Sequence, residues 1–282
     1  MQRSSCATSS RRAANEMSGF SPAFLSSTSN SFVELARAVA PEALPTTAGH
    51  DLGHQVPEGT TIICFRTAAG ILMAGDRRAT IGSMIASHSM GKVRPADDFS
   101  VIGIAGTAGL ALDLIRLYQL ELEHYEKIEG ARLSLAGKAN RLASMLRGNL
   151  SLAMQGLSVV PLFAGVDEAT PAGQIFSFDV TGGKYEEHRF HSIGSGSGYA
   201  RGALKKLWQP GLEFDAAISV AVEALFDASD DDSATGGPDF VRQIAPTIFT
   251  VDLENGVVEV PSADVMSVAA EVVDRRTRKA QS

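Results

Sequence analysis

The residues of this 282-residue chain that most strongly suggest chemistry are Gly59-Thr60-Thr61, where a run of β-forming residues begins. Threonine is a weak nucleophile, because its hydroxyl is almost never ionised at neutral pH and needs a base. A threonine at the start of a chain carries that base, since an α-amino group has a pKa of about 7.7–8.0. Glycine adopts almost any backbone conformation, so the Gly59 carbonyl could lie within reach of the Thr60 hydroxyl. Cleavage between the two residues would free the amine; the alternative is an ordinary turn that leads into a strand.

Two charged residues follow or flank apolar segments and could support this threonine. Asp76 comes directly after the apolar segment 70–75, and Lys92 lies in a short Gly-Lys-Val sequence. A lysine ammonium near the Thr60 amine would lower the pKa of that amine and stabilise negative charge developing on oxygen. The carboxylate would keep the lysine charged and oriented. Solvated loop ends are the alternative interpretation of each charged residue taken alone.

Glycine-rich turns are further candidates for binding an anion or a cofactor. Gly106 lies where a strand pattern changes to a helical one, and the free N–H groups at a helix start can bind an oxyanion. A phosphate loop is disfavoured there, because the Gly-Lys-Ser/Thr ending is missing. The 194–198 turn follows a strand assigned to an antiparallel set, which argues against dinucleotide binding. The acidic 230–237 stretch lacks EF-hand spacing and the six histidines show no metal-ligand pattern, so we expect no metal and no cofactor.

Composition separates residues 1–59 from residues 60–282. The first part is rich in Ser, Ala and Thr with scattered apolar residues, whereas the second shows regular apolar patterning. We therefore expect a weakly ordered leader, residues 1–59, followed by one folded domain, residues 60–282. Residues 1–30 contain no apolar run of secretory-signal length, and no later segment is apolar enough to cross a membrane, so we expect a cytoplasmic protein.

Charge and cysteine content narrow the class further. The formal net charge is −7 and no basic stripe is present, so nucleic-acid binding is not expected. The two cysteines, Cys6 and Cys64, do not suggest a disulfide framework. Cys64 lies in an apolar strand pattern and is predicted to be a small core residue rather than a nucleophile.

Hydrophobic periodicity predicts strands in groups, separated by helices. Strands are expected over 60–65, 70–75, 99–105, 157–165, 174–180, 185–193, 247–252 and 257–260, with a turn at 95–98. Helices are expected over 107–128, 134–155, 199–208, 214–228 and 263–276. Because strands come in runs and do not alternate strictly with helices, antiparallel sheets covered by helices are favoured over a doubly wound parallel sheet. The predicted fold is a layered α/β sandwich.

Taken together, these residues resemble the proteasome β-subunits, most closely the actinobacterial ones, over Thr60 to about Val273. The resemblance implies an α+β fold, the four-layer αββα sandwich of N-terminal-nucleophile hydrolases, with two antiparallel sheets between helix layers. It implies a threonine endopeptidase whose propeptide, residues 1–59, is removed by autocatalytic cleavage between Gly59 and Thr60. Residues 60–282 would be the catalytic domain.

The resemblance also assigns roles to individual positions. The implied catalytic residues are Thr60, Asp76, Lys92, Gly106, Ser195, Asp232 and Thr235. Thr235 stands where the family usually has serine, which keeps the hydroxyl and adds a methyl group.

Substrate contacts are implied in the same way. Thr80 and Ala108 match positions whose backbone pairs with an extended peptide. The first specificity pocket would be lined by Ala79, Met90, Arg94, Ile104, Ala108 and Leu112. Most of these are apolar, so we expect cleavage after large hydrophobic residues, although Arg94 could instead favour acidic ones.

Family members assemble, and the resemblance therefore implies partners. These are further copies in a homo-oligomeric β-ring, α-subunit rings, an ATPase ring that unfolds substrates, and unfolded or tagged protein substrates, with neither nucleic acid nor membrane. One alternative is the simpler bacterial peptidase related to proteasomes, which also starts Thr-Thr-Ile but has a very short leader. The other is a non-catalytic ring-assembly subunit, which usually lacks the threonine or a charged partner, whereas Thr60, Asp76 and Lys92 are all present here.

Overall fold

Strand β1, Thr61–Arg66, shows how the fold is built, because side chains on both of its faces are buried. In the computed structural model, which describes residues 59–280, Ile63 and Phe65 belong to a core shared with helices. Ile62 and Cys64 belong to a second core that lies between two sheets. Successive side chains of a strand alternate between its faces, so an unbroken apolar run indicates a strand covered on both sides.

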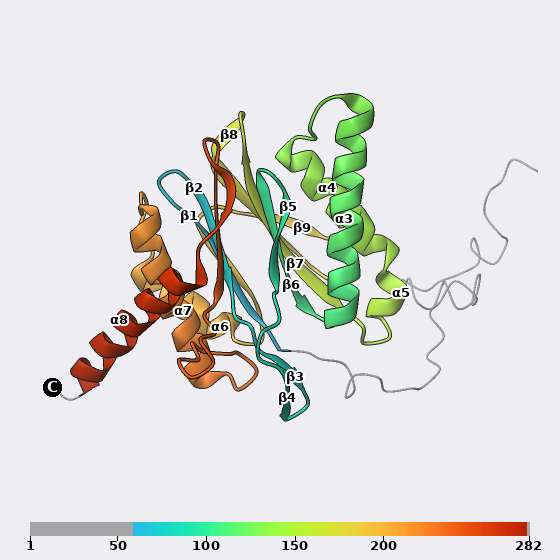
Figure 1. The fold of residues 1–282 in the computed structure, drawn as a ribbon. Helices are drawn as coiled ribbons and strands as arrows, with labels where there is room; N and C mark the ends of the chain where they lie inside the picture. Colours follow the sequence, from blue (N-terminus) through green and yellow to red (C-terminus); the bar gives the residue numbers. More distant parts are fainter. Residues whose placement is uncertain (1–58, 281–282) are drawn as a thin grey trace, which may run out of the picture. The chain divides into compact units, whose positions relative to one another are not determined.

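Two five-stranded antiparallel sheets form the centre of the fold (Figure 1). The first has the order β10-β1-β2-β11-β12, and besides β1 it contains β10 (Phe190–Gly194), β2 (Gly70–Gly75), β11 (Thr247–Asp252) and β12 (Gly256–Glu259). The second runs from β5 to β9 in chain order, with β5 (Val93–Asp97), β6 (Ser100–Gly106), β7 (Val159–Asp167), β8 (Thr170–Phe178) and β9 (Lys184–Glu187). A separate hairpin pairs β3 (Ala79–Ile81) with β4 (Met84–Ser87).

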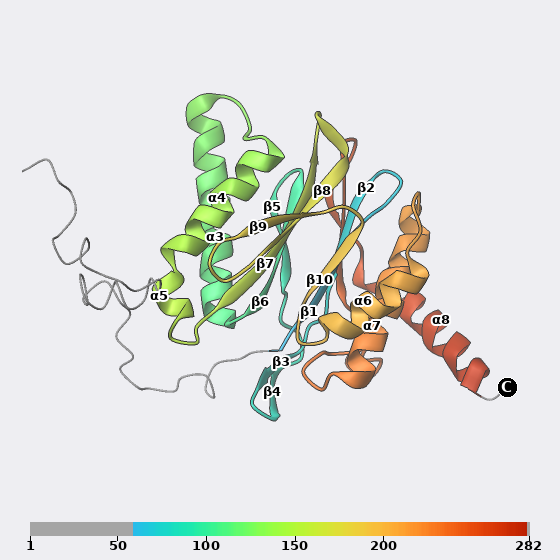
Figure 2. The ribbon, with the colours of Figure 1, turned by 180° about the vertical axis from the view of Figure 1, so that it is seen from behind.

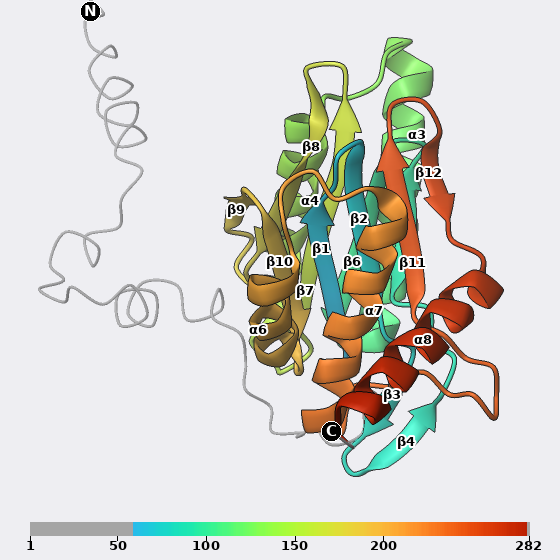
Figure 3. The same cartoon turned by 90° about the vertical axis from the view of Figure 1, so that its left-hand side faces the viewer.

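Helices cover the outer faces of both sheets. On the second sheet lie α3 (Ala108–Glu129) and α4 (Leu135–Gly148), followed by the short α5 (Leu150–Ala153). On the first sheet lie α6 (Ser197–Leu207), α7 (Phe214–Asp231) and α8 (Ser262–Ala280). Figure 2 shows the two helix layers from behind, and Figure 3 shows α7 and α8 in front of the first sheet. The predicted αββα sandwich is confirmed, with one core between the sheets and one under each helix layer.

The order of strand and helix groups is also as predicted, but three local predictions are wrong. The helix expected over 134–155 is interrupted at Asn149, whose side-chain amide donates to the Met145 carbonyl at 3.3 Å. Gly148 and Asn149 are both poor helix formers, which accounts for the break. The strand expected over 185–193 is two strands in different sheets, since β9 pairs with β8 whereas β10 pairs with β1.

The third error concerns the segment before β6. A turn was expected at 95–98, but Pro95 lies within β5, at the edge of the second sheet. Proline cannot donate a backbone hydrogen bond and is tolerated at such an edge. The hairpin β3–β4 was not predicted. None of the helices between residues 59 and 280 is long and apolar enough to cross a bilayer.

Candidate active site

The register of the first sheet determines which residues meet at Thr60. Both β10 and β2 pair antiparallel with β1, and each ends where β1 begins (Figure 3). The residues directly after these two strands are Ser195 and Asp76. The Ser195 N–H donates to the Thr60 carbonyl at 2.8 Å, and the Asp76 N–H donates to the Thr61 carbonyl at 3.1 Å. Two distant parts of the sequence are thus held beside the start of one strand.

The carbonyl oxygen of Gly59 is the point at which the candidate groups converge. It accepts hydrogen bonds from Thr60 Oγ1 at 2.6 Å and from Lys92 Nζ at 2.7 Å. Gly59 has a φ of +99°, and a Cβ built there would lie 2.6 Å from Thr80 Oγ1. Only glycine adopts this conformation readily, and no side chain fits the space. The peptide bond before Thr60 is therefore held with its carbonyl against a hydroxyl and a cation.

Lys92 and Asp76 form a buried ion pair next to this carbonyl. Lys92 Nζ donates to Asp76 Oδ1 at 2.7 Å, and the two side chains are 3% and 0% exposed. The carboxylate also accepts the backbone N–H of Thr61 at 2.8 Å and those of Arg78 and Gly236 at 2.9 Å. Burial lowers the pKa of the Lys92 ammonium, and the neighbouring Asp76 charge opposes this shift. Four donors therefore hold Asp76 in one orientation, and Asp76 in turn orients Lys92.

A second polar cluster lies on the other side of β1. Ser195 Oγ and Thr235 Oγ1 both donate to Asp232 Oδ2 at 2.6 Å. Ser195 Oγ also lies 3.3 Å from the Thr60 carbonyl oxygen. Thr235 makes no hydrogen bond to Thr60, and both residues are among those described; its hydroxyl lies 2.6 Å from that of Thr61. The structure thus brings together Ser195, Asp232 and Thr235, and it adds Thr61, to which the sequence analysis assigned no role of its own.

A small pocket opens beside Thr60 and Lys92, and apolar side chains form most of its wall. Five of the six residues expected to line a specificity pocket do so: Ala79, Met90, Ile104, Ala108 and Leu112. Arg94 does not line this pocket and is exposed on β5. Ala111 and Ile115 were missed, although helical periodicity from Ala108 places both on its face of α3.

Gly106 and Thr80 lie at the rim of the same region. Gly106 ends β6, two residues before the start of α3, and lines the pocket together with Thr60. Thr80 follows the lining residue Ala79 in β3. All the residues that the sequence associated with chemistry are therefore near Thr60 or its supporting clusters, except Arg94.

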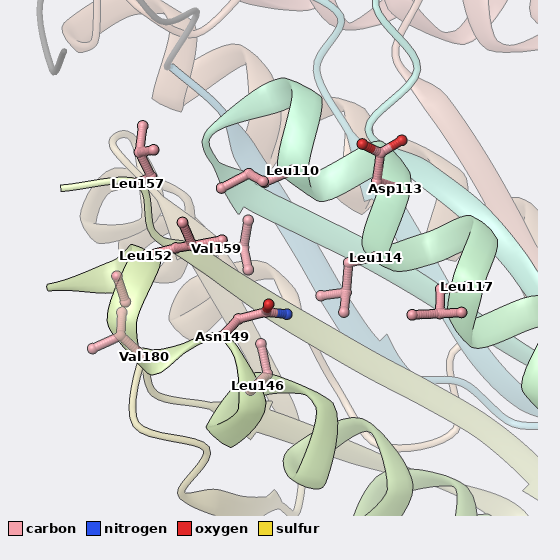
Figure 4. A pocket seen from close by; sticks show the side chains of 11 residues that line it. Leu110, Asp113, Leu114, Leu117, Leu146, Asn149, Leu152, Leu157, Val159 and Val180 are labelled. Atoms are coloured by element: carbon pink, nitrogen blue, oxygen red, sulfur yellow. The ribbon is translucent and has the colours of Figure 1, made fainter. Parts of the chain in front are cut away.

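Two other observations concern sites away from this chemistry. Within residues 59–280, no group of three or more His, Cys, Asp and Glu side chains is placed to hold a metal ion. An apolar pocket lies between α3 and the α4–α5 segment (Figure 4), with Leu110, Leu114 and Leu146 in its wall and the exposed Asp113 at its rim. Asp113 is the one carboxylate among the lining residues, and it is exposed and paired with Arg116, so this second pocket is not our candidate active site.

Comparison with known proteins identifies the class to which this fold and site belong. A sequence model described as "Proteasome subunit" matches residues 56–241. A protein named "Proteasome subunit beta" from Stackebrandtia nassauensis is 54% identical over 269 residues, covering 93% of this chain and 96% of the relative. A second protein of that name, from Saccharomonospora viridis, is 49% identical over 270 residues, covering 91% and 93%.

The chain therefore belongs to the proteasome subunit family. Within that family it is a subunit of the β type, a component of the core particle. Its family is one of proteases, which hydrolyse peptide bonds.

Proposed function

We propose that this β-subunit is catalytically active, a threonine endopeptidase that is made as a precursor and matures by cleaving its own Gly59–Thr60 bond. The observation that carries the proposal is the Gly59 carbonyl oxygen, which lies 2.6 Å from Thr60 Oγ1 and 2.7 Å from Lys92 Nζ. Acyl transfer requires a nucleophile that attacks the carbonyl carbon and a group that stabilises the negative charge developing on the carbonyl oxygen. The Thr60 hydroxyl and the Lys92 ammonium can supply these two functions. Residues 1–59 are then a propeptide and residues 60–282 the catalytic domain.

Maturation begins with attack of Thr60 Oγ1 on the Gly59 carbonyl carbon. The Gly59 oxygen becomes negatively charged and is stabilised by the Lys92 ammonium, which is oriented by Asp76. Collapse of this intermediate breaks the bond between the Gly59 carbon and the Thr60 nitrogen, and that nitrogen takes up the proton that the attacking hydroxyl gave up and becomes a free amine. Gly59 is then held as an ester on Thr60, and hydrolysis of that ester releases the leader as a carboxylic acid and restores the hydroxyl.

Peptide hydrolysis reuses the same hydroxyl with a new base. The liberated α-amine of Thr60 accepts the hydroxyl proton, and its pKa of about 7.7–8.0 suits that role at neutral pH. The nearby Lys92 cation favours the neutral form of the amine. A substrate carbonyl is attacked to give an acyl-enzyme, with the Gly106 N–H as the proposed oxyanion donor, and water then releases the acyl group. The start of β1 is held by the Ser195 N–H, which donates to the Thr60 carbonyl, and by the Thr235 hydroxyl, which meets that of Thr61. Asp232 accepts hydrogen bonds from both Ser195 and Thr235.

The pocket beside Thr60 supports cleavage after large hydrophobic residues. Its wall includes Met90, Ile104, Leu112 and Ile115, and no charged side chain apart from Lys92 is among its lining residues. Arg94 lies outside that lining, so the reason for expecting an acidic preference is weakened. Turnover of fluorogenic peptides that end in Tyr, Arg and Glu tests this point, and a clear preference for Glu would overturn the hydrophobic assignment.

Membership of the family supports a larger assembly. We propose that the subunit forms a homo-oligomeric β-ring stacked with α-subunit rings in the cytoplasm, and that an ATPase ring delivers unfolded or tagged proteins to it. The low-charge apolar pocket fits an extended, unfolded chain better than a folded surface.

The decisive experiment compares Thr60→Ala with Thr60→Ser in the full chain assembled with its α partner. Intact-mass measurement should show that Thr60→Ala retains residues 1–59 and hydrolyses no peptide. Thr60→Ser keeps a hydroxyl and should lose the leader. If Thr60→Ala particles still matured between residues 59 and 60, the mechanism would be wrong. If the wild-type particle itself kept its leader, the non-catalytic alternative would be favoured.

A further inference from the structure

Thr61, the residue after the proposed nucleophile, is fully buried and uses every polar group it has. Its backbone N–H donates to Asp76 Oδ1 at 2.8 Å. Its side-chain Oγ1 accepts the Gly196 N–H at 3.1 Å and lies 2.6 Å from Thr235 Oγ1. Thr61 therefore joins the Asp76 side of the site to the Thr235 side, through its backbone N–H and its side-chain hydroxyl.

The direction of the bond between the two threonine hydroxyls follows from proton counting. A carboxylate accepts hydrogen bonds and does not donate, and each hydroxyl has one proton to give. Thr235 directs its proton to Asp232 Oδ2 at 2.6 Å, so the Thr61 hydroxyl must donate to the Thr235 oxygen. A directed chain results, running from the Gly196 N–H through Thr61 and Thr235 to Asp232.

The same carboxylate oxygen holds Ser195. Because Ser195 Oγ and Thr235 Oγ1 both donate to Asp232 Oδ2, any shift of Thr235 changes the surroundings of Ser195. Ser195 contacts the proposed nucleophile directly, since its N–H donates to the Thr60 carbonyl at 2.8 Å. Thr61 is thus linked to Thr60 in two ways. One is the peptide bond between them, and the other is the series of hydrogen bonds through Thr235, Asp232 and Ser195.

Gly196 provides an independent sign that the turn is built around these oxygens. A Cβ at Gly196 would lie 2.4 Å from Thr61 Oγ1, 2.8 Å from Thr235 Oγ1 and 3.1 Å from Asp232 Oδ2. Its φ of −84° is ordinary, so glycine is required here for space and not for backbone conformation. The three oxygens occupy the place where a side chain would stand.

We infer that Thr61 is a positioning residue for the Thr60 site, and that its hydroxyl fixes Gly196 and Thr235 so that Ser195 and Asp232 stand correctly beside the nucleophile. The inference rests on the proposed function, because it concerns the same site. A purely structural role, in which Thr61 only fills a buried strand position, is the competing explanation.

The test replaces Thr61 by Val, which keeps the shape and removes the hydroxyl, and by Ser, which keeps the hydroxyl. Full chains are assembled with the α partner, and kcat and KM are measured on a hydrophobic fluorogenic peptide. Losing a buried hydrogen-bonded hydroxyl should lower kcat by about tenfold or more in Thr61→Val, with KM changed less than about threefold. Thr61→Ser should recover kcat to within about threefold. Unchanged kcat in Thr61→Val, or equal losses in both variants, would overturn the inference.

Thr235→Val covers the case in which Thr61→Val assembles poorly, and a double-variant cycle applies where both assemble. Thr235→Val removes the same hydroxyl contact from the other side and should also lower kcat without a matching change in KM. If Thr61 acts through Thr235, the combined variant should be little worse than Thr235→Val alone. If the losses of kcat in the two single variants multiplied in the combined variant, the two residues would act independently, and the proposed hydrogen-bond chain would be contradicted. A normal kcat in Thr235→Val would contradict it as well.

Gly196→Ala supplies a third arm with a matched control. The added Cβ should displace the oxygens and lower kcat, whereas Gly198→Ala, where no atom lies within 4 Å, should not. Thr60→Ala separates the two proposals. If Thr60→Ala stays active, the proposed function fails; if it is inactive while Thr61→Val is normal, only the positioning role fails.

Discussion

Asp76 and Lys92 join the two sheets of the sandwich. Asp76 directly follows β2 of the first sheet and Lys92 directly precedes β5 of the second, and their side chains meet at 2.7 Å with almost no exposure to solvent. The pair is not symmetrical, because Asp76 has three backbone N–H donors besides the lysine, while Lys92 has the Gly59 carbonyl as its other acceptor.

This asymmetry predicts different costs for removing each partner. Asp76→Ala leaves a buried ammonium without a counter-ion and three backbone donors without an acceptor, and it should lower the free energy of unfolding by about 3–5 kcal/mol. Lys92→Met leaves a carboxylate that still accepts three hydrogen bonds and should cost less, about 1–3 kcal/mol. Urea unfolding of the full chains before assembly measures both. An equal or greater loss in Lys92→Met would contradict this reading of the pair.

Gly59→Ala should slow maturation without harming the mature enzyme. The positive φ and the close contact with Thr80 Oγ1 disfavour any side chain at this position, at a cost of about 1–3 kcal/mol, or roughly tenfold in rate. Residue 59 leaves with the leader, so kcat per cleaved chain should equal that of the wild type. Gly109→Ala is the control, since its Cβ would meet nothing within 4 Å. The time course of leader loss is followed by intact-mass measurement. It should be slower for Gly59→Ala than for the wild type, and an equal rate would contradict the prediction.

Arg94→Ala should leave cleavage preference unchanged. The side chain is exposed on β5 and lies outside the pocket lining, so the ratio of kcat/KM for Tyr and Glu peptides should shift less than about threefold. Met90→Lys places a cation within the lining and should raise the turnover of Glu peptides relative to Tyr peptides. A large change in the ratio for Arg94→Ala would show that its guanidinium reaches the substrate.

The turn between β8 and β9 should make stability depend on pH in the acidic range. Hydrogen bonds from the Thr181 hydroxyl, the Gly183 N–H and the Tyr185 hydroxyl lower the pKa of Asp179 to about 2. Because the folded-state pKa is below the unfolded value, this stabilisation is present above about pH 4 and is lost as the pH falls toward 2.

Asp179→Asn should therefore be less stable than the wild type at pH 7, by no more than about 1 kcal/mol because the carboxylate is partly exposed and solvent screens its interactions. The difference in melting temperature between the two chains should narrow between pH 4 and pH 2. A difference that stayed constant over this range would rule out the carboxylate as its cause.

The layered fold could be predicted because its signals are local. The unbroken apolar run of β1 indicates burial on both faces, and the helical period that begins after Gly106 gives α3 within about one residue at each end. The change of sheet between β9 and β10 has no such signal, since alternation along a strand does not reveal which neighbour the strand pairs with.

The candidate site shows the same division. Thr60, Asp76 and Lys92 stand at the boundaries of apolar runs and are conspicuous in the sequence. Thr61 was overlooked, because its role depends on strand register and on a turn more than 130 residues away. Arg94 was misplaced relative to the pocket for a different reason: a long charged side chain can turn toward solvent from a strand whose neighbours face inward.

The ion pair between the sheets also bears on the order of events during biosynthesis. Thr60 directly precedes β1 and Asp76 directly follows β2, two neighbouring strands of the first sheet, whereas Lys92 directly precedes β5 of the second. Under the proposed function, a chain in which only the first sheet had formed would hold its hydroxyl without a lysine, so peptidase chemistry would begin only once the two sheets are joined.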